Sequence, residues 1–177
     1  VILHAGVKIG TDGYGYTVEI GPKGPVIAKV PQVGIVEIGN DVEIGSNTCV
    51  DRARFGRTRV GDSVKIDNLV QIGHNVQIAP FVGIIAQAGI AGSAKIETGA
   101  LIWSQAGVSG HLTVHERAQV APQAGVKEDV PEGEYVAGTP AIPKRKFAET
   151  LLFPRMLEKL KRKVADLEAK VKALEAR

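Results

Sequence analysis

The sequence has few of the residues that cross-link an ordinary globular protein or fill its core. Among 177 residues there are one cysteine, one methionine and one tryptophan, and aromatic residues make up 5%. A single cysteine excludes a disulfide framework and fits a reducing compartment. No apolar run approaches the roughly 20 residues of a membrane-spanning helix, and no secretory signal region precedes the first repeat. These absences favour a cytoplasmic protein that is not an integral membrane protein.

What the sequence has instead is a strict six-residue repeat of aliphatic residues. Between Val60 and Pro131 the first position of every hexad is Ile or Val, and the fifth is nearly always small and apolar. The first positions are Val60, Ile66, Ile72, Ile78, Ile84, Ile90, Ile96, Ile102, Val108, Val114, Val120 and Val126. A hexapeptide period is typical of a parallel β-helix, in which each unit buries its apolar face only against its neighbours. Such a core needs few aromatic rings.

Two interruptions and a change of period divide the chain. We assign residues 1–140 to an all-β helix of hexapeptide repeats, and residues 141–177 to a linker and a coiled-coil-like helix. Residues 15–37 contain a Gly-Pro-Lys-Gly-Pro turn and are predicted to form a projecting arm. Residues 52–59 are an Arg-rich corner insertion, because ten residues separate Val50 from Val60 where six are expected.

The carboxyl-terminal segment is basic and has a heptad pattern. With Pro154 near its start, the predicted helix carries Leu and Val in a coiled-coil stripe from Leu157 to Leu174. Residues 144–177 hold eleven Lys or Arg and five Asp or Glu, which suits a solvated surface or a docking site for an acidic partner or phosphate. Nucleic acid is not expected, because no aromatic stacking platform accompanies the charges. The stripe needs a partner. Val at a with Leu at d nominally favours two strands, but hexapeptide β-helices usually form trimers, so we expect a homotrimer in which the helix follows the β-helix.

Three residues are predicted to line one edge of the β-helix. Three hexads make one triangular turn, so Gly92 lies one turn above His74, and His111 lies roughly 10 Å from His74 along the same edge. Acyl transfer needs such a base and a fixed N–H donor for a tetrahedral oxyanion. Asp67, around the preceding corner, is a candidate to orient the ring, as a carboxylate does in a triad. The alternative for His74 is a surface histidine that bonds across a subunit seam.

Several motifs together resemble a known enzyme family. The run from Val64 to Val76, VKIDNLVQIGHNV, is similar to the active-site run of the UDP-3-O-acylglucosamine N-acyltransferases of lipid A synthesis. Further similar motifs are Ile9–Tyr16, Val50–Arg52, Gly89–Ala94, Ser109–Leu112 and Gly138–Pro140. The resemblance covers about residues 1–145. It implies a left-handed β-helix and a cytoplasmic homotrimer with active sites between adjacent chains.

The resemblance also implies an activity. The family transfers a 3-hydroxyacyl chain from acyl carrier protein to the 2-amino group of a UDP-glucosamine already acylated on O3, and we expect no cofactor and no metal. Applied to this chain, His74 would be the general base, Asp67 its support and Gly92 the oxyanion donor. The expected substrate-binding residues are His111, Asn68, Asn75 and Arg52. The acyl chain would lie in an apolar groove past Ala121 and Gly125.

Two features depart from the family. Its amino-terminal uridine-binding domain is absent here, so no nucleotide-contacting residue is assigned. The segment from Arg52 to Arg59 is richer in Arg than the family pattern, which makes it a candidate contact for phosphate or for the carrier protein.

Three other functions remain open at this point. One is another hexapeptide acyltransferase, either the related O-acyltransferase or an enzyme that uses acetyl-CoA. A second is a zinc carbonic anhydrase of the same fold, with His74, His111 and His115 as ligands from two neighbouring chains; it requires three imidazole nitrogens about 2.1 Å from one ion. A third is a structural module without activity.

Overall fold

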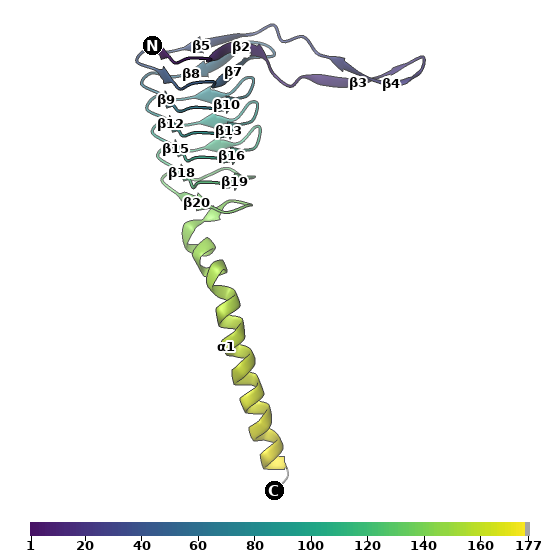
Figure 1. The fold of residues 1–177 in the computed structure, drawn as a ribbon, viewed down its shortest axis with the longest axis vertical. Coiled ribbons are helices and arrows are strands. Elements are labelled where there is room, and N and C mark those ends of the chain that lie inside the picture. Colours follow the sequence, from purple (N-terminus) through teal and green to yellow (C-terminus); the bar gives the residue numbers. More distant parts are fainter. Residues whose placement is uncertain (176–177) are drawn as a thin grey trace. The chain divides into compact units, whose positions relative to one another are not determined.

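The computed structural model describes residues 1–175 and has the predicted left-handed parallel β-helix, a stack of turns with three flat faces (Figure 1). The first face has eight strands, in the order β1 (Ile2–Leu3), β6 (Glu43–Ile44), β9 (Lys65–Ile66), β12 (Gly83–Ile84), β15 (Leu101–Ile102), β18 (Gln119–Val120), β20 (Tyr135–Ala137) and β21 (Ile142–Pro143). Most of these strands have only two residues, so each strand gains its hydrogen bonds from the turns on either side of it.

The other two faces are built in the same way. The second face has six strands, β2 (Lys8–Asp12), β7 (Cys49–Arg52), β10 (Gln71–Ile72), β13 (Gly89–Ile90), β16 (Gly107–Val108) and β19 (Gly125–Val126). The third face has five, β5 (Ile35–Ile38), β8 (Arg57–Val60), β11 (Gln77–Ile78), β14 (Lys95–Ile96) and β17 (Thr113–Val114). Ile72 pairs with Ile90 and Ile78 with Ile96 in parallel register, as the eighteen-residue turn predicts.

The first residue of each hexad forms the core. Ile72, Ile84 and Ile96, one from each face, are at most 1% exposed. The fifth positions, such as Val76 and Ala94, are also buried and fill the space between them. The hydrophobic driving force is therefore supplied by stacked β-branched residues, which suit extended backbone.

The corners depend on left-handed backbone at the fourth hexad position. Twelve residues other than glycine have a positive φ, namely Asp41, Asn47, Ser63, Leu69, Asn75, Phe81, Gln87, Ser93, Gln105, His111, Arg117 and Gln123. Each costs roughly 1–2 kcal/mol for an L-amino acid. Bonds to the adjacent turn, such as that from Ser93 N–H to the His74 carbonyl at 2.9 Å, hold this conformation.

The predicted arm is an antiparallel hairpin. Strands β3 (Tyr16–Gly21) and β4 (Gly24–Lys29) pair with each other and project from the stack of turns (Figure 1). The chain returns to the β-helix at β5, which pairs with β8 on the third face. The last residues of the predicted arm range, 35–37, are therefore part of the solenoid.

The chain divides into two compact units, of which the first ends at Ile142. The second contains one helix, α1 (Lys144–Glu175). It begins ten residues before Pro154, which lies inside the helix and not near its start. The preceding Lys, Arg, Ala, Glu and Leu residues are good helix formers, and one proline removes only one main-chain bond. No helix within residues 1–175 is long and apolar enough to cross a membrane.

The inward and outward positions of one strand provide a stability test. Replacing the buried Ile96 by Ala should lower the free energy of unfolding by about 2–5 kcal/mol, because it leaves a cavity in the stacked core. Replacing its exposed neighbour Lys95 by Ala is the matched control and should change the free energy by less than about 0.5 kcal/mol. Denaturant unfolding followed by circular dichroism measures both. Equal changes in the free energy of unfolding at the two positions would contradict the alternation of inward and outward side chains along the strand.

Candidate active site

His74 lies at the corner between the second and third faces, directly before the left-handed residue Asn75. Gly92 occupies the equivalent place one turn along. A Cβ atom at Gly92 would lie 2.6 Å from Nε2 of His74, so only glycine leaves room for the ring. The predicted stacking of Gly92 on His74 is confirmed, and the catalytic role of both stays a prediction. Within residues 1–175 the N–H of Gly92 donates no hydrogen bond.

A second glycine packs against the opposite side of the imidazole. A Cβ atom at Gly13 would lie 3.0 Å from Cβ and 3.1 Å from Cδ2 of His74. Gly13 is buried and follows β2, where the chain leaves for the arm. The ring is therefore held between two glycines from different turns. Repeat counting could not find Gly13, because it lies outside the unbroken hexads.

Asn75 makes the only hydrogen bond to the His74 ring found within the described part of the chain. Its Oδ1 lies 3.1 Å from Nδ1 of His74 and accepts a bond from Arg54 N–H at 3.0 Å. Its Nδ2 donates to the Phe55 carbonyl at 2.8 Å. Its own N–H donates to Oγ1 of Thr58 at 2.8 Å. The amide of Asn75 is thus fixed by the corner insertion, and its predicted contact with substrate stays a prediction.

His111 lies on the same edge as His74 and Gly92, as predicted. Its N–H donates to the Gly92 carbonyl at 3.2 Å, and its side chain is exposed. The adjacent Gly110 packs closely on that carbonyl, since a Cβ atom there would approach the oxygen to 2.9 Å. An exposed imidazole beside the His74 edge is available to a ligand.

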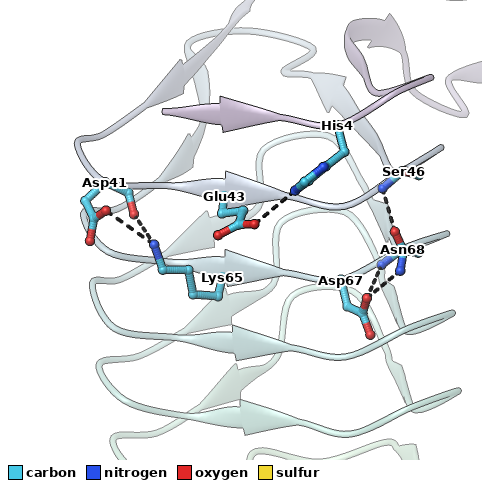
Figure 2. A network of polar contacts seen from close by, with 7 residues as sticks. All are labelled: His4, Asp41, Glu43, Ser46, Lys65, Asp67 and Asn68. Carbon is cyan, nitrogen blue, oxygen red and sulfur yellow. Dashed lines mark hydrogen bonds and ion pairs between the residues drawn. The ribbon is translucent and has the colours of Figure 1, made fainter.

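Asp67 and Asn68 lie at a different corner, where β9 ends on the first face (Figure 2). Oδ1 of Asp67 accepts bonds from N–H and Nδ2 of Asn68, both at 2.7 Å, and Oδ2 accepts from Ala86 N–H at 3.2 Å. Asn68 Oδ1 in turn accepts from Ser46 N–H at 2.7 Å. Within one chain, therefore, the partner of the His74 ring is Asn75 and not Asp67.

The corner of Asp67 and Asn68 borders a pocket on the first face. His4, Glu43 and Lys65 also line it, and Nε2 of His4 lies 2.9 Å from Glu43 (Figure 2). The residues predicted to form one site thus fall into two groups on one chain: His74, Gly92 and His111 at one corner, and Asp67 and Asn68 at another.

Arg52 ties together the two ends of the arm. Its Nε donates to the Gly10 carbonyl at 3.0 Å and its Nη1 to the Gln32 carbonyl at 3.4 Å. These bonds use main-chain oxygens on either side of the hairpin. They show a structural use of the side chain, and its binding of substrate stays a prediction.

Sequence reasoning assigned no role to Asp51, which lies near the His74 edge. Burial raises the pKa of its carboxyl, while bonds from Thr11 and Gln71 and the charge of His74 partly oppose that rise. The bond from Oγ1 of Thr11 is 3.0 Å long. Counting from paired hexads could have found it: Val50 pairs with Ile72, so Asp51 stands beside the residue that precedes His74.

A shallow apolar trough runs along the second face beside this edge. Gly89, Gly107 and Gly125 follow one another on adjacent strands, and Ile90 and Val108 contribute to its floor. A Cβ atom at Gly89 or Gly107 would meet no atom within 4 Å, so the missing side chains leave open space. The trough has a volume of about 480 Å³ and includes Gly125, one of the two residues predicted to border the acyl chain.

Within residues 1–175, no group of three or more His, Cys, Asp or Glu side chains is arranged to hold a metal ion. His115 instead pairs with Glu97 on the third face, Nδ1 to Oε2 at 3.0 Å. In one chain the three histidines considered for zinc therefore do not converge.

Similarity to known proteins is extensive in sequence. No protein-family model matches the chain. It is 49% identical over 178 aligned residues to the UDP-3-O-acylglucosamine N-acyltransferase of Anaeromyxobacter sp. strain K, which covers 99% of this chain and 50% of that protein. It is 57% identical over 147 residues to the enzyme of the same name from Sinorhizobium fredii, covering 83% and 41% respectively. The chain spans about half the length of these relatives.

Solved structures agree on the fold. The UDP-N-acetylglucosamine acyltransferase of Francisella novicida superposes with a TM-score of 0.70 at 26% identity, over 80% of this chain and 49% of that one. The corresponding Arabidopsis enzyme gives a TM-score of 0.68 at 20% identity, over 81% and 46%. The fold is thus that of hexapeptide acyltransferases.

The raised pKa of Asp51 predicts a pH effect on stability. The folded protein binds this proton more tightly than the unfolded chain, so the stabilisation is complete below the ordinary Asp pKa and is lost as pH rises through the raised pKa. Asp51→Asn cannot ionise, so the difference between its Tm and the wild-type Tm should move in favour of the variant as pH rises across that window, and then stay constant. Thermal unfolding at several pH values measures the difference. If the wild-type Tm instead rises relative to the variant Tm as pH increases, the predicted direction of the pH effect is wrong.

Proposed function

We propose that this chain, homologous over nearly its whole length to part of the UDP-3-O-acylglucosamine N-acyltransferases, carries the acyl-transfer site of such an enzyme. The proposed reaction moves a 3-hydroxyacyl chain from acyl carrier protein to the 2-amino group of a UDP-3-O-acyl-glucosamine, in the cytoplasm. The observation that carries the proposal is the imidazole of His74 held against Gly92, at an edge beside an open trough.

The chemistry assigned to this edge is one proton transfer and one displacement. The amine nitrogen attacks the thioester carbonyl carbon, a C–N bond forms, and His74 accepts the amine proton at Nε2. The N–H of Gly92 donates to the oxyanion of the tetrahedral intermediate. The C–S bond then breaks, and the proton on His74 passes to the leaving thiol. The products are an amide and the free thiol of the carrier arm, so atoms and charge balance.

The trough on the second face suits the acyl chain. It starts beside the His74 edge, and Gly89 and Gly107 leave open space on adjacent strands. An alkyl chain that lies there removes its own apolar surface from water, which contributes roughly 0.8 kcal/mol per buried methylene. His111, exposed on the same edge, is then placed to contact the polar end of the acyl group.

A site that uses both groups of predicted residues requires two copies of the chain. Asp67 and Asn68 lie at one corner of the prism and His74 at another, so one copy cannot close both around a substrate. We therefore propose a homotrimer in which the Asp67 corner of one copy faces the His74 edge of the next. The exposed apolar stripe of α1, from Leu157 to Leu174, fits contact between copies in such an assembly.

The basic charge of the carboxyl-terminal segment suits an acidic partner. Residues 144–177 carry eleven Lys or Arg against five Asp or Glu. An excess of positive charge on an exposed helix attracts an acidic protein and speeds the encounter. Acyl carrier protein as the donor is consistent with this charge.

The nearest alternative is O-acyl transfer, with UDP-N-acetylglucosamine, the sugar nucleotide in the names of the solved structures, as the acceptor. The sequence relatives favour N-acyl transfer, because identity to them is 49% over nearly the whole chain against 26% to the Francisella novicida structure.

The role of His74 is tested by replacing it in the complete protein, with any segments that flank this chain. His74→Ala should lower kcat by about 10²–10⁴, the usual worth of a positioned general base, with the assembly intact by size-exclusion chromatography. Mass spectrometry of the product formed from acylated carrier protein and UDP-3-O-acyl-glucosamine is the assay. His115→Ala, away on the third face, is the control and should retain activity. An unchanged rate in His74→Ala would remove this residue from the mechanism.

The assembly is tested by mixing inactive subunits. Random trimers of His74→Ala and Asp67→Ala chains should regain about one quarter of wild-type activity, because one interface in four then joins two intact halves. His74→Ala mixed with His111→Ala is the matched control and should regain none, since both residues lie on one edge of one chain. Recovery in neither mixture would mean that Asp67 and His74 do not act from different copies.

A further inference from the structure

We propose that the corner insertion, residues 52–59, acts through Asn75 to fix which nitrogen of His74 carries the proton. Asn75 is then a positioning residue, and the insertion serves through its main chain and not through its arginine side chains. The catalytic consequence rests on the acyl transfer proposed above, whereas the protonation site of the ring is measurable without it.

The orientation of the Asn75 amide follows from its main-chain partners. Oδ1 accepts from Arg54 N–H at 3.0 Å, and Nδ2 donates to the Phe55 carbonyl at 2.8 Å. A main-chain N–H can only donate and a carbonyl can only accept. If the amide were turned over, Nδ2 would face the Arg54 N–H, a donor against a donor, and Oδ1 would face the Phe55 carbonyl, an acceptor against an acceptor. The oxygen of Asn75 is therefore the atom that faces the ring.

The protonation of His74 follows from that orientation. Oδ1 of Asn75 has no proton to give, so the 3.1 Å contact requires Nδ1 of His74 to be the donor. In a neutral imidazole with a proton on Nδ1, Nε2 is the unprotonated nitrogen. Nε2 is also the atom that faces Gly92. The lone pair of the proposed base thus lies where the reaction needs it before substrate arrives.

The insertion is packed tightly enough to keep its main-chain groups in place. Gly34 N–H donates to the Ala53 carbonyl at 2.9 Å, and Ile35 N–H to the Gly56 carbonyl at 3.0 Å. A Cβ atom at Gly34 would lie 2.6 Å from the first of these oxygens and 2.7 Å from the second, so the return strand of the arm abuts the insertion. Thr58, whose hydroxyl accepts from Asn75 N–H, is fully buried.

The neighbouring turns show what the insertion adds. Ser93 and His111 occupy the same left-handed corner position as Asn75 on the next two turns. Within the described residues, neither side chain makes a hydrogen bond. An ordinary hexad brings no spare main-chain groups to this position, and the four additional residues between Val50 and Val60 supply them.

The experiment measures the His74 tautomer and the rate in the same complete protein. Two-bond ¹H–¹⁵N spectra should show a proton on Nδ1 of neutral His74 in the wild type and a mixture of tautomers in Asn75→Ala. The kcat of Asn75→Ala should fall at least about tenfold, by less than that of His74→Ala. Ser93→Ala is the matched control: it places Ala in the same left-handed conformation but removes no bond to the ring, so the tautomer should not change.

Asn75→Asp tests the mechanism from the other direction. Aspartate keeps an acceptor for Nδ1 and loses only the bond to the Phe55 carbonyl, so the Nδ1–H form should persist. Its negative charge should favour the protonated ring and shift the acidic limb of the kcat/KM profile to higher pH. A mere loss of packing would not move this limb. If the acidic limb of Asn75→Asp stays where it is in the wild type while the fold is intact, the proposed role of Asn75 is overturned.

The outcomes separate this inference from the proposed function. A proton on Nε2 in the wild type, or the same tautomer in Asn75→Ala as in the wild type, overturns the inference whatever the activity. Full acyl transfer by His74→Ala overturns the proposed function, while the tautomer result stands.

Discussion

The fixed register between successive turns is the constraint on which the rest of the structure depends. Most strands are two residues long and have no stability of their own, so main-chain bonds from each turn to the next hold them, such as Gly73 N–H to the Ile90 carbonyl at 2.8 Å. The same bonds keep twelve residues other than glycine in left-handed conformation at the corners. That strain persists because the surrounding ladder over-determines it. A rigid pitch then places residues eighteen apart on top of one another.

This constraint explains how far the sequence could predict the site. His74, Gly92 and His111 lie within the unbroken hexads, where counting residues gives position along the stack, and their shared edge was predicted correctly. Counting also placed Asp67 correctly around the preceding corner, but it did not show the partners of the carboxylate, which bonds Asn68 and Ala86 and not the His74 ring. The contacts of Gly13 and the insertion come from interruptions of the repeat, whose paths are set by packing that no period encodes.

For the carboxyl-terminal helix, the sequence predicted the element correctly but not the residue at which it begins. Pro154 suggested a start near that residue, whereas α1 begins at Lys144. A proline inside a helix costs about 3 kcal/mol or more, but here good helix-forming residues precede it and follow it, and their summed preference favours continuing the helix. Local rules therefore identified the element and misplaced its beginning.

The regular part of a β-helix can hold chemistry only where the repeat is decorated. Most of its main-chain groups bond the adjacent turns, and its apolar side chains fill the core, so few groups are available to position a reactive one. Glycine provides space, as at Gly92 and at Gly89 and Gly107. Inserted main chain provides additional donors and acceptors, as at Arg54 and Phe55. The two devices meet at His74: glycines on either side leave room for the ring, and the insertion orients it through Asn75. Flat faces offer no enclosure, so a substrate that must be surrounded needs a second copy to close the remaining side.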